Sequence, residues 1–258
     1  MLNAINSKLH ILNGLHTILT NEIEFQNAAA QNNVTITDYR KIQSESEVVA
    51  QGSYRERKAK VILTVGTDCN IGKMTTLLEM KEEFDKRNLK CDFIATGQTG
   101  ILLRGRGIAV DSMVGDYIAG SVEKEIDQSV QEGYDFILVE GQGSLTHMGY
   151  SGVTLGLLHG SMPDAMILCH QPTRLTDNYG LPLPDLSQCI AVHEDLMSFF
   201  KPSKVVGIGL NSVGLTERES QDVAEELEKK LCLPTVDAFR FGAAKLVDAV
   251  LNYLQEQK

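Results

Sequence analysis

A candidate phosphate-binding loop is the first chemical feature of the sequence. The stretch VILTVGTDCNIGKMTT at 61–76 reads as an apolar strand, a turn bounded by Gly66 and Gly72, then Lys73 and a helix. Glycine permits turns that a side chain would block, and the first amides of a helix carry the positive end of its dipole. Beside the Lys73 ammonium group, such amides bind anions. We therefore expect a phosphorylated ligand here, the alternative being an ordinary strand-to-helix turn with an incidental lysine.

The loop departs from the usual pattern GxxxxGK[ST] at two points. Five residues separate Gly66 from Gly72, a spacing that resembles the GTD-type loops of dethiobiotin synthetase and its relatives. Met74 stands where the usual hydroxyl binds Mg²⁺, and Thr75 lies about 100° further round the helix axis. Thr76, or a carboxylate from another segment, is the remaining source of a ligand. These departures weaken the case for magnesium-dependent phosphoryl transfer more than the case for phosphate binding.

An asparagine at a later strand end extends the predicted cofactor site. Asn211 follows the apolar run 205–209, and its amide can both donate to and accept from a nucleobase edge, although a turn or cap role is equally compatible. The residues assigned to cofactor binding are Gly66, Thr67, Asp68, Cys69, Asn70, Ile71, Gly72, Lys73, Met74, Thr75, Thr76 and Asn211.

A carboxylate follows the apolar run at 136–139. Glu140 and the glycines at 141 and 143 form a strand end at which backbone and ligand can approach closely. Ligands of parallel sheets bind beyond the carboxyl ends of the strands. Glu140 is therefore a candidate to take a proton from an attacking amine or to hold Mg²⁺, against the alternative of an exposed loop acid.

Polar residues also follow the run at 91–95. Gln98, Arg104 and Arg106 lie in a glycine-rich segment, where two arginines can hold a substrate carboxylate in bidentate fashion, although solvated surface arginines are nearly as compatible. Asp111 precedes a helical stripe and is a helix cap, a metal ligand, or both. With Glu140, it would serve as a metal ligand only if Mg²⁺ is used.

Two further side chains have chemical potential. His147 lies just past the Glu140 loop and can act as an acid or base near neutral pH, although a lone histidine is more often structural. Cys69 lies inside the phosphate loop, where helix amides can lower a thiol pKa, but simple packing is the better interpretation.

The elements that must position these residues alternate along the chain. Helical stripes separate the apolar runs, including one formed by Val114, Ile118, Val122, Ile126 and Val130. Strands are predicted at 61–65, 91–95, 136–139, 165–169, 205–209 and 234–236. Near-continuous apolar strands joined by helices predict an α/β fold with a parallel sheet covered on both faces.

The predicted architecture is a P-loop NTPase-like three-layer sandwich with a short N-terminal helical and linker lead-in. We place the lead-in at 1–60, which holds an amphipathic segment at about 9–25 and the polar stretch SYRERKAK, and the P-loop domain at 61–258.

Bulk properties narrow the class of protein. The chain of 258 residues is 43% hydrophobic and 22% charged, as in ordinary soluble domains, and its net charge of -10 argues against a nucleic-acid partner. Five scattered cysteines without CxxC spacing read as reduced thiols. The first residues are too polar for a secretory signal, and no apolar run is long enough to cross a membrane. We expect a cytoplasmic protein, a homo-oligomer, without membrane or nucleic-acid partners.

Several blocks together resemble the P-loop family that includes D-glutamate N-acetyltransferase. They are GTDCNIGKMTT, TGQTGILLRGRGIAVD, VEGQGSLTH and YSGVTLGLLHGSMPDAMILCHQP, and the resemblance covers nearly everything from residue 61 onward. Upstream, GLHTIL at 14–19 and ITDYRK at 36–41 resemble the end of that family's N-terminal domain, most of which we expect to be absent here.

The resemblance implies transfer of an acetyl group from acetyl-CoA to the amino group of an acidic amino acid such as D-glutamate. Lys73 and the loop amides would bind cofactor phosphates, and Arg104 or Arg106 would hold the substrate carboxylate. Glu140 or His147 would deprotonate the amine, and the amides of the 141–143 turn would stabilise the oxyanion.

Two alternatives remain open. An ATP- and Mg²⁺-dependent ligase or kinase-like enzyme of the dethiobiotin synthetase type would bind ATP in the loop, and Asn211 would read the adenine. A nucleotide-binding module without turnover is the third interpretation.

Overall fold

A parallel six-stranded sheet is the centre of the computed structural model, which describes residues 1–257. Strand order across the sheet is β4-β5-β3-β6-β7-β8, and every neighbouring pair is parallel. The strands are β3 (Lys60–Gly66), β4 (Cys91–Ile94), β5 (Phe136–Val139), β6 (Ala165–His170), β7 (Lys204–Leu210) and β8 (Thr235–Val236). The predicted α/β P-loop fold and its strands are confirmed, with bounds shifted by at most one residue at either end.

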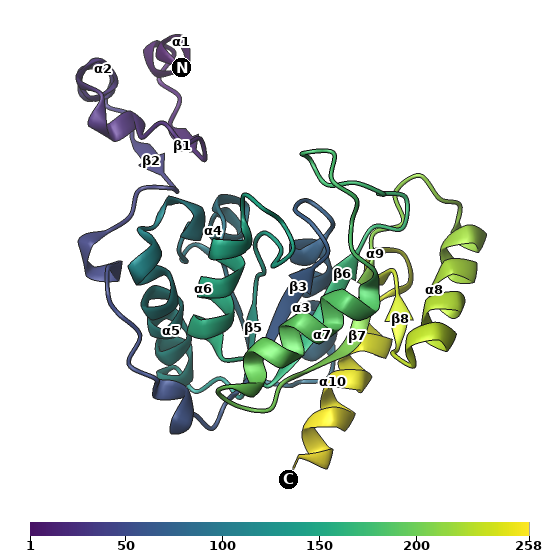
Figure 1. Cartoon of the computed structure of the whole chain (residues 1–258). Coiled ribbons are helices and arrows are strands. Elements are labelled where there is room, and N and C mark those ends of the chain that lie inside the picture. Colours follow the sequence, from purple (N-terminus) through teal and green to yellow (C-terminus); the bar gives the residue numbers. More distant parts are fainter. Residues whose placement is uncertain (258) are drawn as a thin grey trace.

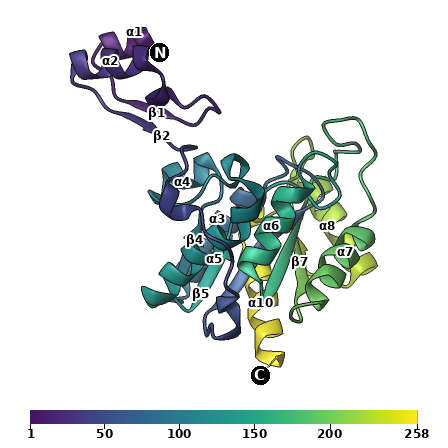
Figure 2. The ribbon, with the colours of Figure 1, turned by 60° about the vertical axis from the view of Figure 1, so that its left-hand side comes forward.

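Helices cover both faces of this sheet (Figures 1 and 2). Side chains of α5, α6 and α7 pack in one apolar cluster, and those of α3 and α10 pack in the other. The helices of this part of the chain are α3 (Lys73–Lys86), α4 (Gln98–Arg104), α5 (Gly115–Gln131), α6 (Ser151–Ser161), α7 (Leu186–Ser198), α8 (Glu217–Leu231), α9 (Ala238–Phe241) and α10 (Ala244–Glu256). Because both faces are buried, the strands can be apolar at nearly every position.

The helix stripes match these clusters with one exception. Ile118, Val122 and Ile126 of the predicted five-residue stripe are buried, and Val130 packs against the same cluster. Val114 was wrongly included, because it precedes α5 and is 57% exposed. Among residues 1–257, no helix combines the length and apolar character needed to cross a membrane.

The N-terminal segment forms a small α/β unit of its own. It contains α1 (Leu2–Asn6), β1 (Ile11–Asn13), a 3-10 turn η1 (Leu19–Asn21), α2 (Ile23–Asn32) and β2 (Ile36–Asp38). Strands β1 and β2 pair in parallel. The amphipathic segment predicted at 9–25 thus contains a short strand that was not foreseen. In Figures 1 and 2 the unit lies beyond α4, whereas the end of α10 lies at the opposite end of the molecule.

A strap of irregular chain connects this unit to the sheet. It carries 3-10 turns η2 (Ser44–Ser46) and η3 (Ser53–Arg55) and lies along α5. The buried Glu123 carboxylate on α5 accepts hydrogen bonds from the amides of Gln51 and Ser53, the latter at 2.7 Å. The strap is therefore fixed to the P-loop domain by hydrogen bonds.

The chain order places a crevice at the carboxyl ends of the central strands. From β3 the chain moves to β4 and β5 on one side, and then crosses to β6 on the other. The loops after β3 and β5 therefore start side by side, at the kind of position where ligands of open α/β sheets bind.

Candidate functional site

The loop after β3 folds around the Lys73 side chain. Gly72 adopts φ 95°, a left-handed conformation that favours glycine, and α3 begins at the next residue. The Lys73 Nζ atom donates to the carbonyl oxygens of Asp68 at 2.6 Å and Gly143 at 2.8 Å. An ammonium group has three donors, so one remains for a ligand. Burial lowers the pKa of Lys73 below its usual 10.5, and a bound anion would favour its charged form.

Gly141 allows the β5 loop to approach this lysine. A side chain at Gly141 would lie 1.7 Å from the Thr64 carbonyl oxygen of β3, which no substitution can accommodate. The Gly141 amide donates to the Thr64 hydroxyl at 3.0 Å. The amide of Gly141 is therefore already engaged, and Gln142 and Gly143 carry the remaining amides of the predicted oxyanion turn.

A cavity of about 930 Å³ opens beside Lys73. Its wall combines the phosphate loop, the start of α4, the loop after β5 and part of the N-terminal unit. The predicted site residues on this wall are Cys69, Asn70, Ile71, Gly72, Lys73, Met74, Thr75, Gln98, Asp111, Glu140 and Asn211. The chain thus brings together residues from five distant segments, as the rule for strand ends predicts.

Glu140 lies in this cavity wall with little contact to solvent. It is 4% exposed, and its carboxylate accepts the amides of Thr96 at 2.9 Å and Gly97 at 3.2 Å. Burial raises the pKa of the Glu140 carboxyl above its usual 4.5, although these two amides partly oppose the shift. A buried carboxyl group with a raised pKa, held next to a cavity, is suited to proton transfer.

His147 occupies a different environment from Glu140. It is 2% exposed, stacks on Tyr150 and does not line the cavity. Its Nδ1 accepts the Gly149 amide at 3.1 Å, which leaves Nε2 to donate to the Asn178 Oδ1 at 2.5 Å. Both ring nitrogens are therefore engaged within the fold. The catalytic role stays a prediction, and the geometry favours Glu140 as the base.

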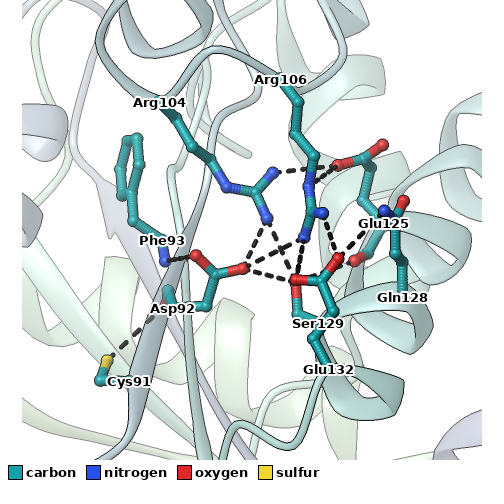
Figure 3. Close-up of polar contacts among 9 residues, drawn as sticks. All are labelled: Cys91, Asp92, Phe93, Arg104, Arg106, Glu125, Gln128, Ser129 and Glu132. Carbon is teal, nitrogen blue, oxygen red and sulfur yellow. Dashed lines mark hydrogen bonds and ion pairs between the residues drawn. The ribbon is translucent and has the colours of Figure 1, made fainter.

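Arg104 and Arg106 lie on the α5 side of the loop and outside the cavity wall (Figure 3). Arg104 pairs with Asp92 at 2.5 Å and Glu125 at 3.0 Å, and Arg106 pairs with Glu132. The carboxylates of the chain itself thus occupy both guanidinium groups. A substrate role for them stays a prediction that this position does not favour.

Two other residues of the phosphate loop have firm local roles. The Asp68 carboxylate is fully buried and accepts from Arg174 Nη1 at 2.9 Å. Atoms of Asp68, Cys69 and His147 lie within 4.8 Å of one another, but Arg174 already balances the charge of Asp68. Burial raises the pKa of Cys69 above its usual 9.0, so its thiol is protonated at neutral pH. Packing is therefore the better account of Cys69.

The residues that could bind Mg²⁺ in an ATP-dependent enzyme do not converge on one free site. Thr75 faces the cavity, while Thr76 is 5% exposed and its hydroxyl lies beside Gly209 of β7. Asp111 pairs with Arg40, and Glu140 is held by two amides. Each carboxylate thus already has a partner within the chain.

A second cavity of about 370 Å³ adjoins the loop near Asn211. Gly72, Thr75 and Asn211 line both cavities. The other residues of the smaller one are Thr76, Leu210, Val213, Asp237, Phe239 and Arg240. The Asn211 Oδ1 accepts the Val213 amide at 3.2 Å, which leaves its NH₂ group for a ligand.

Arg40 and His16 also line the large cavity, and no sequence pattern singled them out. Both belong to the N-terminal unit, and Arg40 contacts Gln98 and Asp111 across 58 and 71 positions of sequence. The available signal was the resemblance of the blocks GLHTIL and ITDYRK, which contain these two residues.

Comparisons with known proteins agree with this organisation. A family model described as the P-loop domain of DUF1611, a domain of unknown function, matches residues 48–247. A second, described as the Rossmann-like N-terminal domain DUF1611_N, matches residues 1–42.

Two curated relatives carry the name D-glutamate N-acetyltransferase. The protein from Tritonibacter scottomollicae is 41% identical over 254 residues, which cover 97% of this chain and 74% of the relative. The protein from a Pseudoalteromonas species is 37% identical over 248 residues, which cover 95% of this chain and 73% of the relative.

A solved structure of a DUF1611 family protein from Anabaena variabilis ATCC 29413 is also similar. It superposes with a TM-score of 0.92 at 36% identity, covering 97% of this chain and 74% of that protein.

Proposed function

The chain belongs to the DUF1611 family of P-loop proteins, and on that premise we propose that it is an N-acetyltransferase that acetylates the amino group of an acidic amino acid. The observation that carries the proposal is that the buried Glu140 carboxyl and the Lys73 loop line one cavity. A transferase needs a site for the donor and a base for the acceptor within reach of each other.

Lys73 would hold the donor. Acetyl-CoA carries phosphates, and the loop offers the uncommitted Lys73 N–H together with the first amides of α3. The smaller cavity beside Asn211 has an apolar wall from Val213 and Phe239, suited to a nucleobase. Such binding requires no phosphoryl transfer, which is consistent with Met74 in place of the usual hydroxyl.

Glu140 would act as the general base. Once the substrate ammonium has lost one proton to solvent, the amine nitrogen attacks the acetyl carbonyl carbon, and Glu140 takes its second proton. The carbon–nitrogen bond forms, the carbon–sulfur bond breaks, and the thiolate leaves and is protonated. The amides of Gln142 or Gly143 would stabilise the oxyanion of the tetrahedral intermediate.

Substituting Glu140→Gln tests this assignment. The amide side chain keeps the shape and can still accept from Thr96 and Gly97, but it cannot take the proton. We expect kcat for acetyl transfer to fall about 10²- to 10⁴-fold. The measurement is the initial rate of N-acetyl amino acid formation, followed by mass spectrometry.

Glu225→Gln is the matched control, because Glu225 lies on α8 with a side chain that is 72% exposed. An unchanged rate for Glu140→Gln, with the same fold as the wild-type protein, removes Glu140 as the base.

ATP with Mg²⁺ is the competing ligand for the phosphate loop, in a ligase or kinase-like enzyme. The smaller cavity beside Asn211 would suit the adenine of either donor. The partners of Asp111 and Glu140 within the chain, and Met74 in the loop, make the acetyl-CoA proposal the simpler one.

A further inference from the structure

The N-terminal unit supplies one wall of the large cavity. His16 and Arg40 lie on this wall, and both come from the N-terminal unit, whereas the phosphate loop follows β3 of the P-loop domain. Arg40 and Lys73 are the lysine or arginine side chains among the residues that line the cavity. Since Lys73 belongs to the phosphate loop, Arg40 is the cation available to a second ligand.

Arg40 is buried and held on several sides. It is 8% exposed, and its Nε donates to the Gly14 carbonyl oxygen at 2.7 Å. Its Nη2 donates to Gln98 Oε1 at 2.9 Å, and its Nη1 pairs with Asp111. A guanidinium has five N–H donors, so one hydrogen on each terminal nitrogen remains uncommitted. These contacts fix the guanidinium in place and leave two of its N–H donors for a ligand.

The start of α4 ties Arg40 to the proposed base. The Gly97 amide donates to the Glu140 carboxylate, and the next side chain, Gln98, accepts from Arg40. The guanidinium and the base are thus attached to consecutive residues. An amino acid carries its amine and its nearest carboxylate on one carbon atom, which matches a base and a guanidinium attached to consecutive residues.

The Figure 3 cluster supplies a precedent within the same protein for an arginine shared by two acids. Arg104 binds Asp92 and Glu125 at once, which shows that one guanidinium can donate to a second carboxylate while it stays bound to the first. Arg40 already has Asp111, whose side chain is 37% exposed and can stay hydrated.

We propose that Arg40, held by Gln98 and Asp111, binds a carboxylate of the acceptor amino acid, so that the N-terminal unit forms part of the acceptor site. This inference rests on the proposed acetyl transfer and names the side chain that selects an acidic acceptor. It replaces Arg104 and Arg106 in that role, because neither of them lines the cavity and each already pairs with at least two carboxylates of the chain.

The test pairs Arg40→Met with acceptors in which one carboxylate is changed to a carboxamide. In the wild-type protein, amidation of the carboxylate that Arg40 binds should raise the KM of the acceptor about 10- to 100-fold. Arg40→Met should raise the KM of the unmodified acceptor by a similar factor and abolish its preference over that amide. The KM of acetyl-CoA should change less than twofold.

Arg87→Met is the matched control, because Arg87 also forms ion pairs but lies at the end of α3 distant from the phosphate loop. If the preference for the carboxylate persists in Arg40→Met for both the α- and side-chain amides, the inference is overturned. Should Arg40→Met fail to fold, Arg40→Gln replaces it, and an unchanged acceptor KM in that variant counts equally against the inference.

Failure of the proposed function has a different signature. If the wild-type protein acetylates no acidic amino acid, calorimetric titration with acidic amino acids still reads the Arg40 site. Binding that is lost in Arg40→Met and kept in Arg87→Met supports the carboxylate site, whereas equal binding or no binding to the wild-type protein overturns it.

Discussion

Glu140 holds a carboxyl group where its ionised form is unfavourable. The Thr96 and Gly97 amides, a hydrogen bond from the Gln142 side chain and the coulombic attraction of Lys73 compensate only in part for the loss of water. This is the arrangement expected of a group selected for proton transfer more than for stability.

Two pH effects follow from the raised pKa of Glu140. Since the base must be ionised, kcat/KM should rise with pH through a midpoint above 4.5, the usual value of a glutamate. The sign for stability is opposite: the neutral carboxyl is favoured in the fold, so its stabilising contribution is complete below the unfolded pKa and is lost as pH rises through the folded pKa. Glu140→Gln, which cannot ionise, should therefore be at least as stable as the wild-type protein near pH 7.

Denaturant unfolding of both proteins at pH 5 and pH 8 measures this. A variant that is clearly less stable than the wild-type protein at pH 8 would show that the ionised carboxylate stabilises the fold, contrary to the account.

The sequence placed some site residues well and others poorly. Lys73 and Glu140 were predictable because each directly follows a strong apolar strand, and strand ends meet at one edge of a parallel sheet. Arg40 was not, because its contacts with Gln98 and Asp111 join distant segments. Arg104 and Arg106 were misleading since their loop turns them toward acids on β4 and α5, which no local pattern reveals.

At the level of elements, burial decided what could be predicted. Strands β3, β5, β6 and β7 are runs of mostly buried apolar residues, and their pattern is visible in sequence. Strands β1 and β2 have three residues each, of which only Asn13 is buried. Such a segment has no periodicity to detect.

The strap on α5 gives a prediction at this scale. Glu123→Ala removes the buried carboxylate that accepts from the Gln51 and Ser53 amides. We expect the free energy of unfolding to fall by about 1–3 kcal/mol, because two part-buried hydrogen bonds to a charged acceptor are lost. Urea titration measures it, with Glu225→Ala on the exposed face of α8 as control. A loss below about 0.5 kcal/mol, typical of surface changes, would mean that the strap is held by other contacts.

At the scale of the whole molecule, two units meet around one cavity. The P-loop domain contributes the phosphate loop and Glu140, and the N-terminal unit contributes Arg40 and His16. This organisation accounts for a family in which the P-loop and N-terminal regions occur in one chain. The boundary predicted at 60/61 and a homo-oligomeric state stay predictions.

The most direct test of the central claim, that a donor held at Lys73 transfers acetyl to an amine beside Glu140, is product formation by the purified protein. With an acidic amino acid and acetyl-CoA, the wild-type protein should form the N-acetyl product, and Lys73→Met should raise the KM of acetyl-CoA about 10- to 100-fold. Formation of ADP from ATP and Mg²⁺, with no acetyl product from acetyl-CoA, would contradict the account.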